Sequence, residues 1–130
     1  MILGTKIFLT LTGLTYIALS IWCTVAPATT SRKVGFDLIG GSGSSEFLVI
    51  YGGLEMAMGI IFLAPWIRSE WTYPALWACV VIHACLAIYR TIGFIQFEKI
   101  ESLTYRLAIG EWLIFLVSLA LLLGGRGVDK

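Results

Sequence analysis

The segment Tyr51–Gly59 reads YGGLEMAMG and lies in the middle of an apolar run from about Glu46 to Pro65. A run of this length can form a helix that crosses the ~30 Å hydrocarbon core of a bilayer. Glu55 is the carboxylate in the interior of this run. Ionisable side chains inside a membrane span are rare and costly, and they face the protein interior. We therefore predict that Glu55 points into a bundle of helices and is a candidate for a functional site.

Glycines surround Glu55 and indicate close helix packing. Gly52, Glu55 and Gly59 fall at positions i, i+3 and i+7, so they share one face of a helix. Small residues on such a face let a second helix come near. Gly52, Gly53 and Gly59 are therefore predicted to be packing positions, with Glu55 pressed into the seam between two helices.

The composition is that of an integral membrane protein. The chain has 130 residues, of which 58% are hydrophobic and 13% are charged, and its mean hydropathy is +0.91. A chain of this composition is expected to contact the lipid bilayer. The net charge of +1 gives no basis for nucleic-acid binding. Three cysteines lie in apolar runs without the spacing of metal ligands, so we interpret them as small buried residues and expect no metal: Cys23, Cys79 and Cys85.

Three further apolar runs accompany the one that holds Glu55. They cover approximately residues 4–26, 74–97 and 103–124. Together with 46–65 they predict an all-α fold, an integral membrane four-helix bundle that forms a single domain over 1–130. Pro27 is expected to end the first helix, because proline cannot continue the backbone hydrogen-bond ladder.

The connection between the first and second spans is predicted to lie at the membrane surface. Over residues 28–40, Thr29, Thr30 and Ser31 could cap a short helix. Its apolar side chains would dip into the membrane, namely Val34, Phe36, Leu38 and Ile39. The Gly- and Ser-rich stretch 40–45 is predicted to be a flexible link into the second span.

Polar residues of the first span form a stripe of Thr5, Thr12, Tyr16 and Ser20. Two interpretations stay open. The hydroxyl groups could bond to carbonyls of their own helix, as Ser and Thr often do. Alternatively, the stripe could face a polar interior of the bundle.

A second set of polar residues lies at a common depth. Counted from the end opposite the termini at ~1.5 Å per residue, Arg90 is about 10 Å deep, Glu111 about 10–12 Å and Glu55 about 13 Å. Tyr51 is one turn shallower than Glu55, and His83 is deeper than Arg90. We predict a polar cluster of these five residues, with Arg90 inside the bundle and hydrogen-bonded to at least one glutamate.

The role of this cluster has several interpretations. A buried Arg–Glu pair can simply lock the third and fourth helices in register. The same groups could instead hold a ligand, a quinone or a proton, or they could contact a partner protein. One arginine leaves a surplus carboxylic acid, which is either protonated or joined by a cation. For His83, a structural hydrogen bond and a proton-handling role are both open, and a link to the cluster would need water.

The segment Tyr51–Gly59, with its Gly53, Glu55 and Gly59, resembles the DoxX-like proteins. It is most similar to small bacterial four-helix members whose function is not known. The resemblance implies a four-helix bundle in the bacterial inner membrane. Some members of the wider group look like membrane subunits of quinone-linked oxidoreductases, and a distant animal relative looks like an assembly chaperone for receptor channels. The stretch 40–45 is not part of the pattern.

Three functional hypotheses follow. The sequence shows no nucleophile–base pair, metal cluster or cofactor motif, so the first is a non-enzymatic accessory protein that binds a partner membrane protein or its own copies, without a catalytic residue. The second is a membrane subunit of a redox system that binds a quinone or another lipophilic ligand, including a lipid. The third is proton or ion transport by an oligomer, which would use the surplus carboxylate.

Overall fold

The computed structural model describes residues 2–125, and over this range the chain is all-α, without strands. Its helices are α1 (Ile2–Val25), α2 (Pro27–Lys33), α3 (Gly40–Phe47), α4 (Glu55–Leu63), α5 (Thr72–Gln96) and α6 (Ser102–Gly125). Four segments are long and apolar enough to cross a membrane: Ile2–Val25, Gly40–Trp66, Ser69–Gln96 and Ser102–Gly125. The predicted fold class is thereby confirmed. Of the predicted domain over 1–130, residues 1 and 126–130 lie outside the described range.

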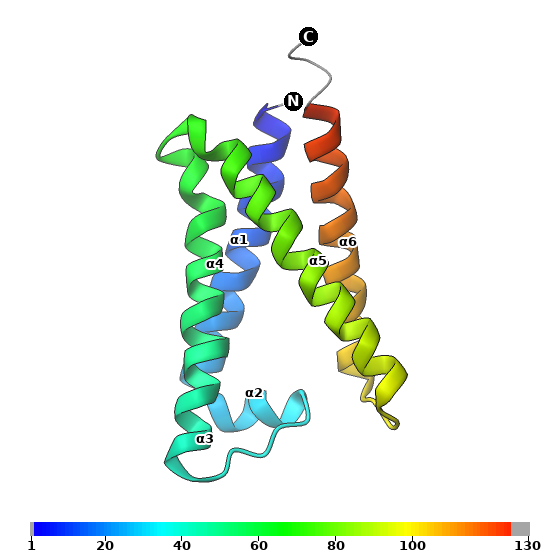
Figure 1. Ribbon diagram of the computed structural model, residues 1–130. Helices are drawn as coiled ribbons and strands as arrows, with labels where there is room; N and C mark the ends of the chain where they lie inside the picture. The colour runs from blue at the N-terminus through cyan, green and yellow to red at the C-terminus, as the bar shows by residue number, and fades with distance from the viewer. Residues whose placement is uncertain (1, 126–130) are drawn as a thin grey trace.

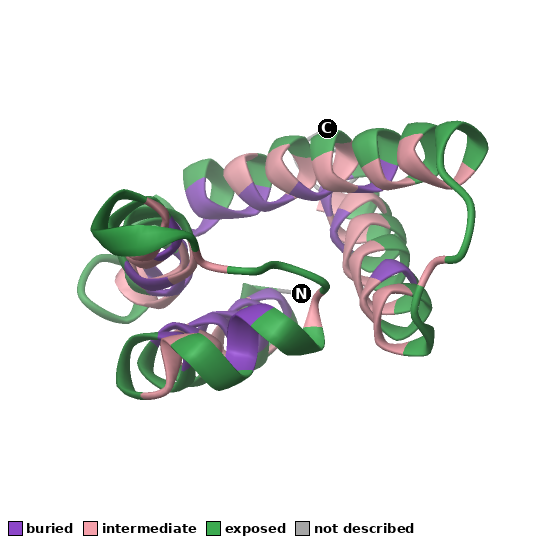
Figure 2. Ribbon diagram, turned by 90° about the horizontal axis from the view of Figure 1, so that it is seen from below, coloured by how far each residue is buried: buried purple, intermediate pink, exposed green. Residues whose placement is uncertain are grey.

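The helices form two neighbouring pairs. α1 packs along α4, and α5 packs along α6 (Figure 1). α5 meets α4 near the end of the molecule where α1 begins, and it diverges from α4 toward the opposite end, which carries α2. Buried residues lie on the inner sides of the helices and exposed residues face outward (Figure 2). Exposed apolar side chains on the outside suit a lipid environment.

The crossing of α1 and α4 depends on two glycines. A Cβ atom added at Gly59 would lie 2.9 Å from the carbonyl oxygen of Gly13 and 2.5 Å from Cγ1 of Ile17. A Cβ at Gly13 would lie 2.9 Å from the carbonyl oxygen of Gly59. The two backbones therefore touch, as the sequence predicted for Gly59. The partner glycine of α1 was not singled out from the sequence.

Of the other two glycines predicted to pack, only one does. A Cβ at Gly52 would lie 2.9 Å from Oγ1 of Thr24 on α1. Gly53 is exposed, and a Cβ there would meet nothing within 4 Å. The prediction for Gly53 is wrong because residues adjacent in a helix point about 100° apart, so one narrow seam cannot hold both.

A π-helical turn, Leu48–Leu54, joins α3 to α4 within the second span. A π turn departs from the regular hydrogen-bond ladder, and such turns occur frequently at functional sites. Here the carbonyl of Gly52 accepts a hydrogen bond from the hydroxyl of Ser20 on α1, at 2.7 Å. Glu55 follows directly as the first residue of α4.

The stretch 40–45 is not a flexible link. It forms the start of α3, which continues without a break into the second span, so this span begins at Gly40 rather than at Glu46. The hydroxyl of Ser44 bonds to the carbonyl of Gly40, at 3.0 Å. Extending an existing membrane helix satisfies backbone groups that a loop would leave unpaired near lipid, and this outweighs the low helix propensity of glycine.

The surface segment also differs from the prediction. α2 begins directly at Pro27, whose fixed φ suits a first helical position, and it ends at Lys33. The residues expected to cap a later helix, Thr29, Thr30 and Ser31, therefore lie inside it, and residues 34–39 are not helical. Gly35, at φ 82°, adopts a left-handed conformation that stops α2. The third span begins with a 3₁₀ turn at Ser69, before the predicted start at Pro74.

Candidate functional site

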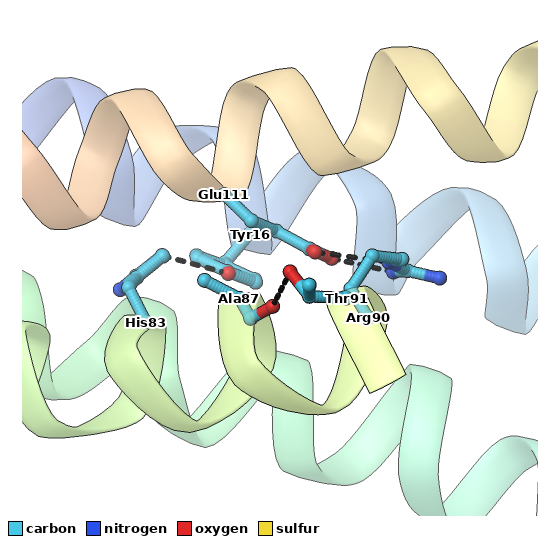
Figure 3. Close-up of polar contacts among 6 residues, drawn as sticks. All are labelled: Tyr16, His83, Ala87, Arg90, Thr91 and Glu111. Carbon is cyan, nitrogen blue, oxygen red and sulfur yellow. Dashed lines mark hydrogen bonds and ion pairs between the residues drawn. The ribbon is translucent and has the colours of Figure 1, made fainter. Parts of the chain in front are cut away.

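Arg90 of α5 binds Glu111 of α6 through two parallel hydrogen bonds (Figure 3). Nε lies 3.0 Å from one carboxylate oxygen, and Nη2 lies 2.5 Å from the other. The side chains of Arg90 and Glu111 are 29% and 14% exposed, so the pair is largely shielded. The predicted contact of Arg90 with a glutamate is present, and the partner is Glu111 rather than Glu55.

The short connection between α5 and α6 explains this choice. Arg90 lies six residues before α5 ends, and Glu111 lies nine residues after α6 begins. Antiparallel helices that share a tight turn place such positions at the same depth. Glu55 belongs to the other helix pair, and α5 diverges from α4 toward this end. The common depth of Arg90 and Glu111 was therefore predictable from the sequence. The choice of Glu111 over Glu55 as the partner of Arg90 depended on which helices pack together.

Part of the Arg90 guanidinium stays available. Arginine has five N–H donors in a planar fork, and two of them bind Glu111. One terminal nitrogen points away from Glu111 (Figure 3). It has no hydrogen-bond partner among residues 2–125. Arg90 also forms part of the wall of a cavity, so these donors can serve a molecule within it.

This cavity, of about 590 Å³, lies at the end of the molecule that carries α2. Its walls come from the α2–α3 connection, the second half of α5 and the start of α6 with the loop before it. They are Val34, Gly35, Phe36, Leu86, Tyr89, Arg90, Gly93, Phe94, Phe97, Lys99, Ile100, Glu101 and Thr104. Most of the wall is apolar, with several aromatic rings. The sequence did not reveal this cavity, because three separate segments form it.

His83 and Tyr16 form a separate, fully enclosed contact. His83 is 0% exposed, and its Nε2 lies 2.9 Å from the hydroxyl of Tyr16 on α1. Its Nδ1 lies 2.8 Å from the carbonyl oxygen of Cys79. A carbonyl can only accept, so Nδ1 carries the proton and Nε2 accepts from the tyrosine. This contact supports the structural interpretation of His83. The sequence offered one clue, since both residues lie near the middle of their spans.

The polar stripe of α1 shows both predicted behaviours. All four residues are buried: Thr5, Thr12, Tyr16 and Ser20. Thr12 donates to the carbonyl of Phe8 in its own helix, at 3.0 Å. Tyr16 and Ser20 instead bond to other helices. The stripe therefore faces the interior, and it uses both local and interhelical partners.

Tyr51 and Glu55 do not join the Arg90–Glu111 pair. The ring of Tyr51 stacks on Phe47, with centroids 4.6 Å apart, and packs against Phe36 at 5.9 Å. Oε2 of Glu55 is buried without a hydrogen-bond partner among the described residues. The five residues predicted as one cluster thus come from three spans and form no single hydrogen-bonded network over residues 2–125. Over residues 2–125, no three His, Cys, Asp or Glu side chains gather into a group that could hold a metal ion.

Comparison with known proteins does not assign a family, since no family model, curated protein or solved structure matches this chain. Function is therefore inferred from the cavity and the Arg90–Glu111 pair at its wall. These two features supply a partly open, largely apolar cavity and a fixed hydrogen-bond donor in the same place.

Proposed function

We propose that this integral membrane protein binds a lipophilic small molecule in the cavity beside Arg90. The observation that carries the proposal is the cavity itself, of about 590 Å³, with largely apolar walls and one oriented guanidinium. Ligand sites typically enclose ~300–1,000 Å³ and combine apolar walls with a few fixed polar groups. Binding without catalysis is the simplest role, because the wall contains no nucleophile paired with a base.

The chemistry of the wall suits a molecule dissolved in the membrane. Phe36, Phe94 and Phe97 offer apolar ring surface to a hydrocarbon body. Arg90 lies about 9 Å from the end of α5, counted at ~1.5 Å per residue, so its donors sit below the membrane surface. Glu111 holds the guanidinium in one orientation, and a fixed donor loses less entropy on binding than a free one.

The resemblance of Tyr51–Gly59 to the DoxX-like proteins adds support. We propose on this basis that the chain is a DoxX-like protein of the bacterial inner membrane. A quinone is then one concrete ligand, and a role as a small subunit of a redox system would follow. A membrane lipid remains the other concrete ligand, because it too reaches the cavity by lateral diffusion.

Extraction of lipophilic molecules from purified protein tests the proposal. Gly93 lies in the cavity wall, and a Cβ there would meet only Phe97, at 4.0 Å. Gly93→Leu should therefore narrow the cavity beside Arg90 without disturbing the helix backbone. Mass spectrometry should find a lipophile enriched over bulk phospholipid in the wild type and lost in Gly93→Leu.

The matched control is Gly53→Leu, at an exposed site with nothing within 4 Å of its Cβ. This variant adds the same side chain on the opposite helix pair and should retain the lipophile. An extract that contains only bulk phospholipid in all three proteins would contradict the proposal.

A second candidate function is an accessory protein that binds a partner membrane protein or its own copies. It is favoured by α6, which packs mainly against α5. Only 17% of the most apolar 18-residue segment of α6 is buried. Such a helix has a wide face available to another membrane protein. Copurification in mild detergent tests it, and a monomer that brings down no partner would count against it.

A further inference from the structure

We infer that the cavity selects molecules whose polar end is an uncharged carbonyl group, and that Glu111 sets this selectivity by neutralising Arg90. The inference rests on the proposed function and specifies the ligand of the same site. Its first support is the two-pronged contact of Arg90 with Glu111, which places one negative charge against one positive charge.

The charges at the cavity balance. Arg90 is paired with Glu111, and the other charged wall residues are Lys99 and Glu101, one of each sign. A carboxylate or phosphate that entered would lose its hydration without finding a net positive charge. The cavity is therefore a poor site for a fatty acid or an acidic phospholipid head group, although an arginine forms part of its wall.

The remaining donors of Arg90 are nevertheless open to an acceptor from the cavity. A terminal nitrogen of Arg90 faces away from Glu111 without a partner among residues 2–125, and an unpaired N–H group is costly once a bound molecule shields it from water. A carbonyl oxygen accepts these N–H groups through its lone pairs and brings no charge. A pure hydrocarbon offers no acceptor. A neutral carbonyl on an apolar body thus matches both the charge and the hydrogen-bonding capacity of the site.

Two kinds of membrane molecule carry this chemistry. A quinone has ring carbonyls, and an acylglycerol has ester carbonyls. Both are uncharged and both carry long apolar chains. The shared feature that Arg90 would recognise is the carbonyl oxygen, and the experiment below separates the two sources.

The test is a binding titration of the full chain in nanodiscs of uncharged lipid. Four ligands with a ten-carbon chain are compared: a decyl-benzoquinone, monodecanoylglycerol, decanoate and decane. Wild-type protein should bind at least one carbonyl compound about tenfold or more tightly than decanoate and decane. Whether the quinone or the ester binds more tightly identifies the source of the carbonyl.

Glu111→Gln tests the selectivity directly. It leaves an amide oxygen to hold Arg90 and gives the cavity a net positive charge. The ratio of decanoate to carbonyl affinity should rise about tenfold or more. Glu111→Asp keeps the charge and should retain wild-type selectivity. Glu98→Gln is the matched control, because Glu98 is exposed on the same connection and is not part of the cavity wall.

The outcomes distinguish a failure of the proposed function from a failure of the selectivity inference. If wild-type protein binds none of the four ligands, the proposed function is wrong. If wild-type protein binds decanoate as tightly as the carbonyl compounds, the selectivity inference is overturned and ligand binding stands. An unchanged ratio in Glu111→Gln would also overturn it. If Glu111→Gln fails to fold, the ratio of decanoate to carbonyl affinity in the wild type and in Glu111→Asp still tests the selectivity inference.

Discussion

Arg90 holds both carboxylate oxygens of Glu111, with Nε 3.0 Å from one and Nη2 2.5 Å from the other. The contact joins α5 to α6 and fixes the rotation of the guanidinium at the cavity wall. Arginine keeps its proton under essentially all conditions, so at this depth it needs a partner. We therefore expect the pair to stabilise the contact of α5 with α6 and, under the proposed function, to bind the ligand with the same two side chains.

Removal of one member of this pair should destabilise the folded protein more than removal of both. Arg90→Ala leaves Glu111 unpaired, which typically costs ~3–5 kcal/mol in soluble proteins and less in membranes. In thermal unfolding in detergent, the double variant Arg90→Ala/Glu111→Gln should lose less stability than the two single variants lose when their losses are added. The control cycle pairs Arg90→Ala with Glu55→Gln and should be additive, because these side chains do not bond. Additivity in the first cycle would show that the contact is absent.

Gly59 and Gly53 should respond in opposite directions to the same substitution. Gly59→Ala places a methyl group 2.9 Å from the Gly13 carbonyl, so α1 and α4 must separate, at a cost of ~1–3 kcal/mol. Gly53→Ala enters open space and should stabilise the helix by ~0.5–1 kcal/mol. Both are measured by unfolding in the same detergent. Equal effects at the two sites would contradict the close crossing.

Tyr16→Phe should destabilise the bundle through His83. The substitution removes the hydroxyl that donates to Nε2 and leaves a buried acceptor unpaired. The expected loss is ~0.6–2 kcal/mol, within the range for interhelical hydrogen bonds in membranes. In the wild type, ¹⁵N NMR of the imidazole should show the proton on Nδ1, which donates to the Cys79 carbonyl. A proton on Nε2 would refute this arrangement.

Gly41→Ala should distinguish a helix from a flexible link in the stretch 40–45. Gly41 lies in α3, and a Cβ there meets nothing within 4 Å. Alanine should therefore stabilise the protein by ~0.5–1 kcal/mol through its higher helix propensity. In a flexible link the same change would leave the unfolding temperature unaltered, and that result would favour the loop.

The sequence was informative about membrane spans and about depth. Hydropathy located the four spans, because lipid forces backbone groups into helices. Counting along each helix placed Arg90 and Glu111 in one layer, and they do meet. The close approach of a helix at Gly59 was also predicted correctly, since a glycine on a buried face permits it.

The sequence was less informative about lateral arrangement. Tyr51 and Glu55 were expected near the depth of Arg90, yet neither is hydrogen-bonded to it, and the deeper His83 bonds to Tyr16 instead. Which helices pair, and how far α5 diverges from α4, depends on the summed packing of many side chains and not on any one spacing. The cavity follows from that divergence, so residue patterns along single helices could not predict it.

Photolabelling tests the central claim, that a lipophilic molecule occupies the cavity beside Arg90. A decyl-benzoquinone or a decanoyl glycerol that carries a diazirine in its chain is irradiated with the protein in membranes, and the labelled peptides are identified by mass spectrometry. The predicted result is label within 86–97 and 34–36, competed by unlabelled carbonyl compound, lost in Gly93→Leu and retained in Gly53→Leu. Label spread over the exposed apolar residues of α6, without competition and unaffected by Gly93→Leu, would contradict the claim.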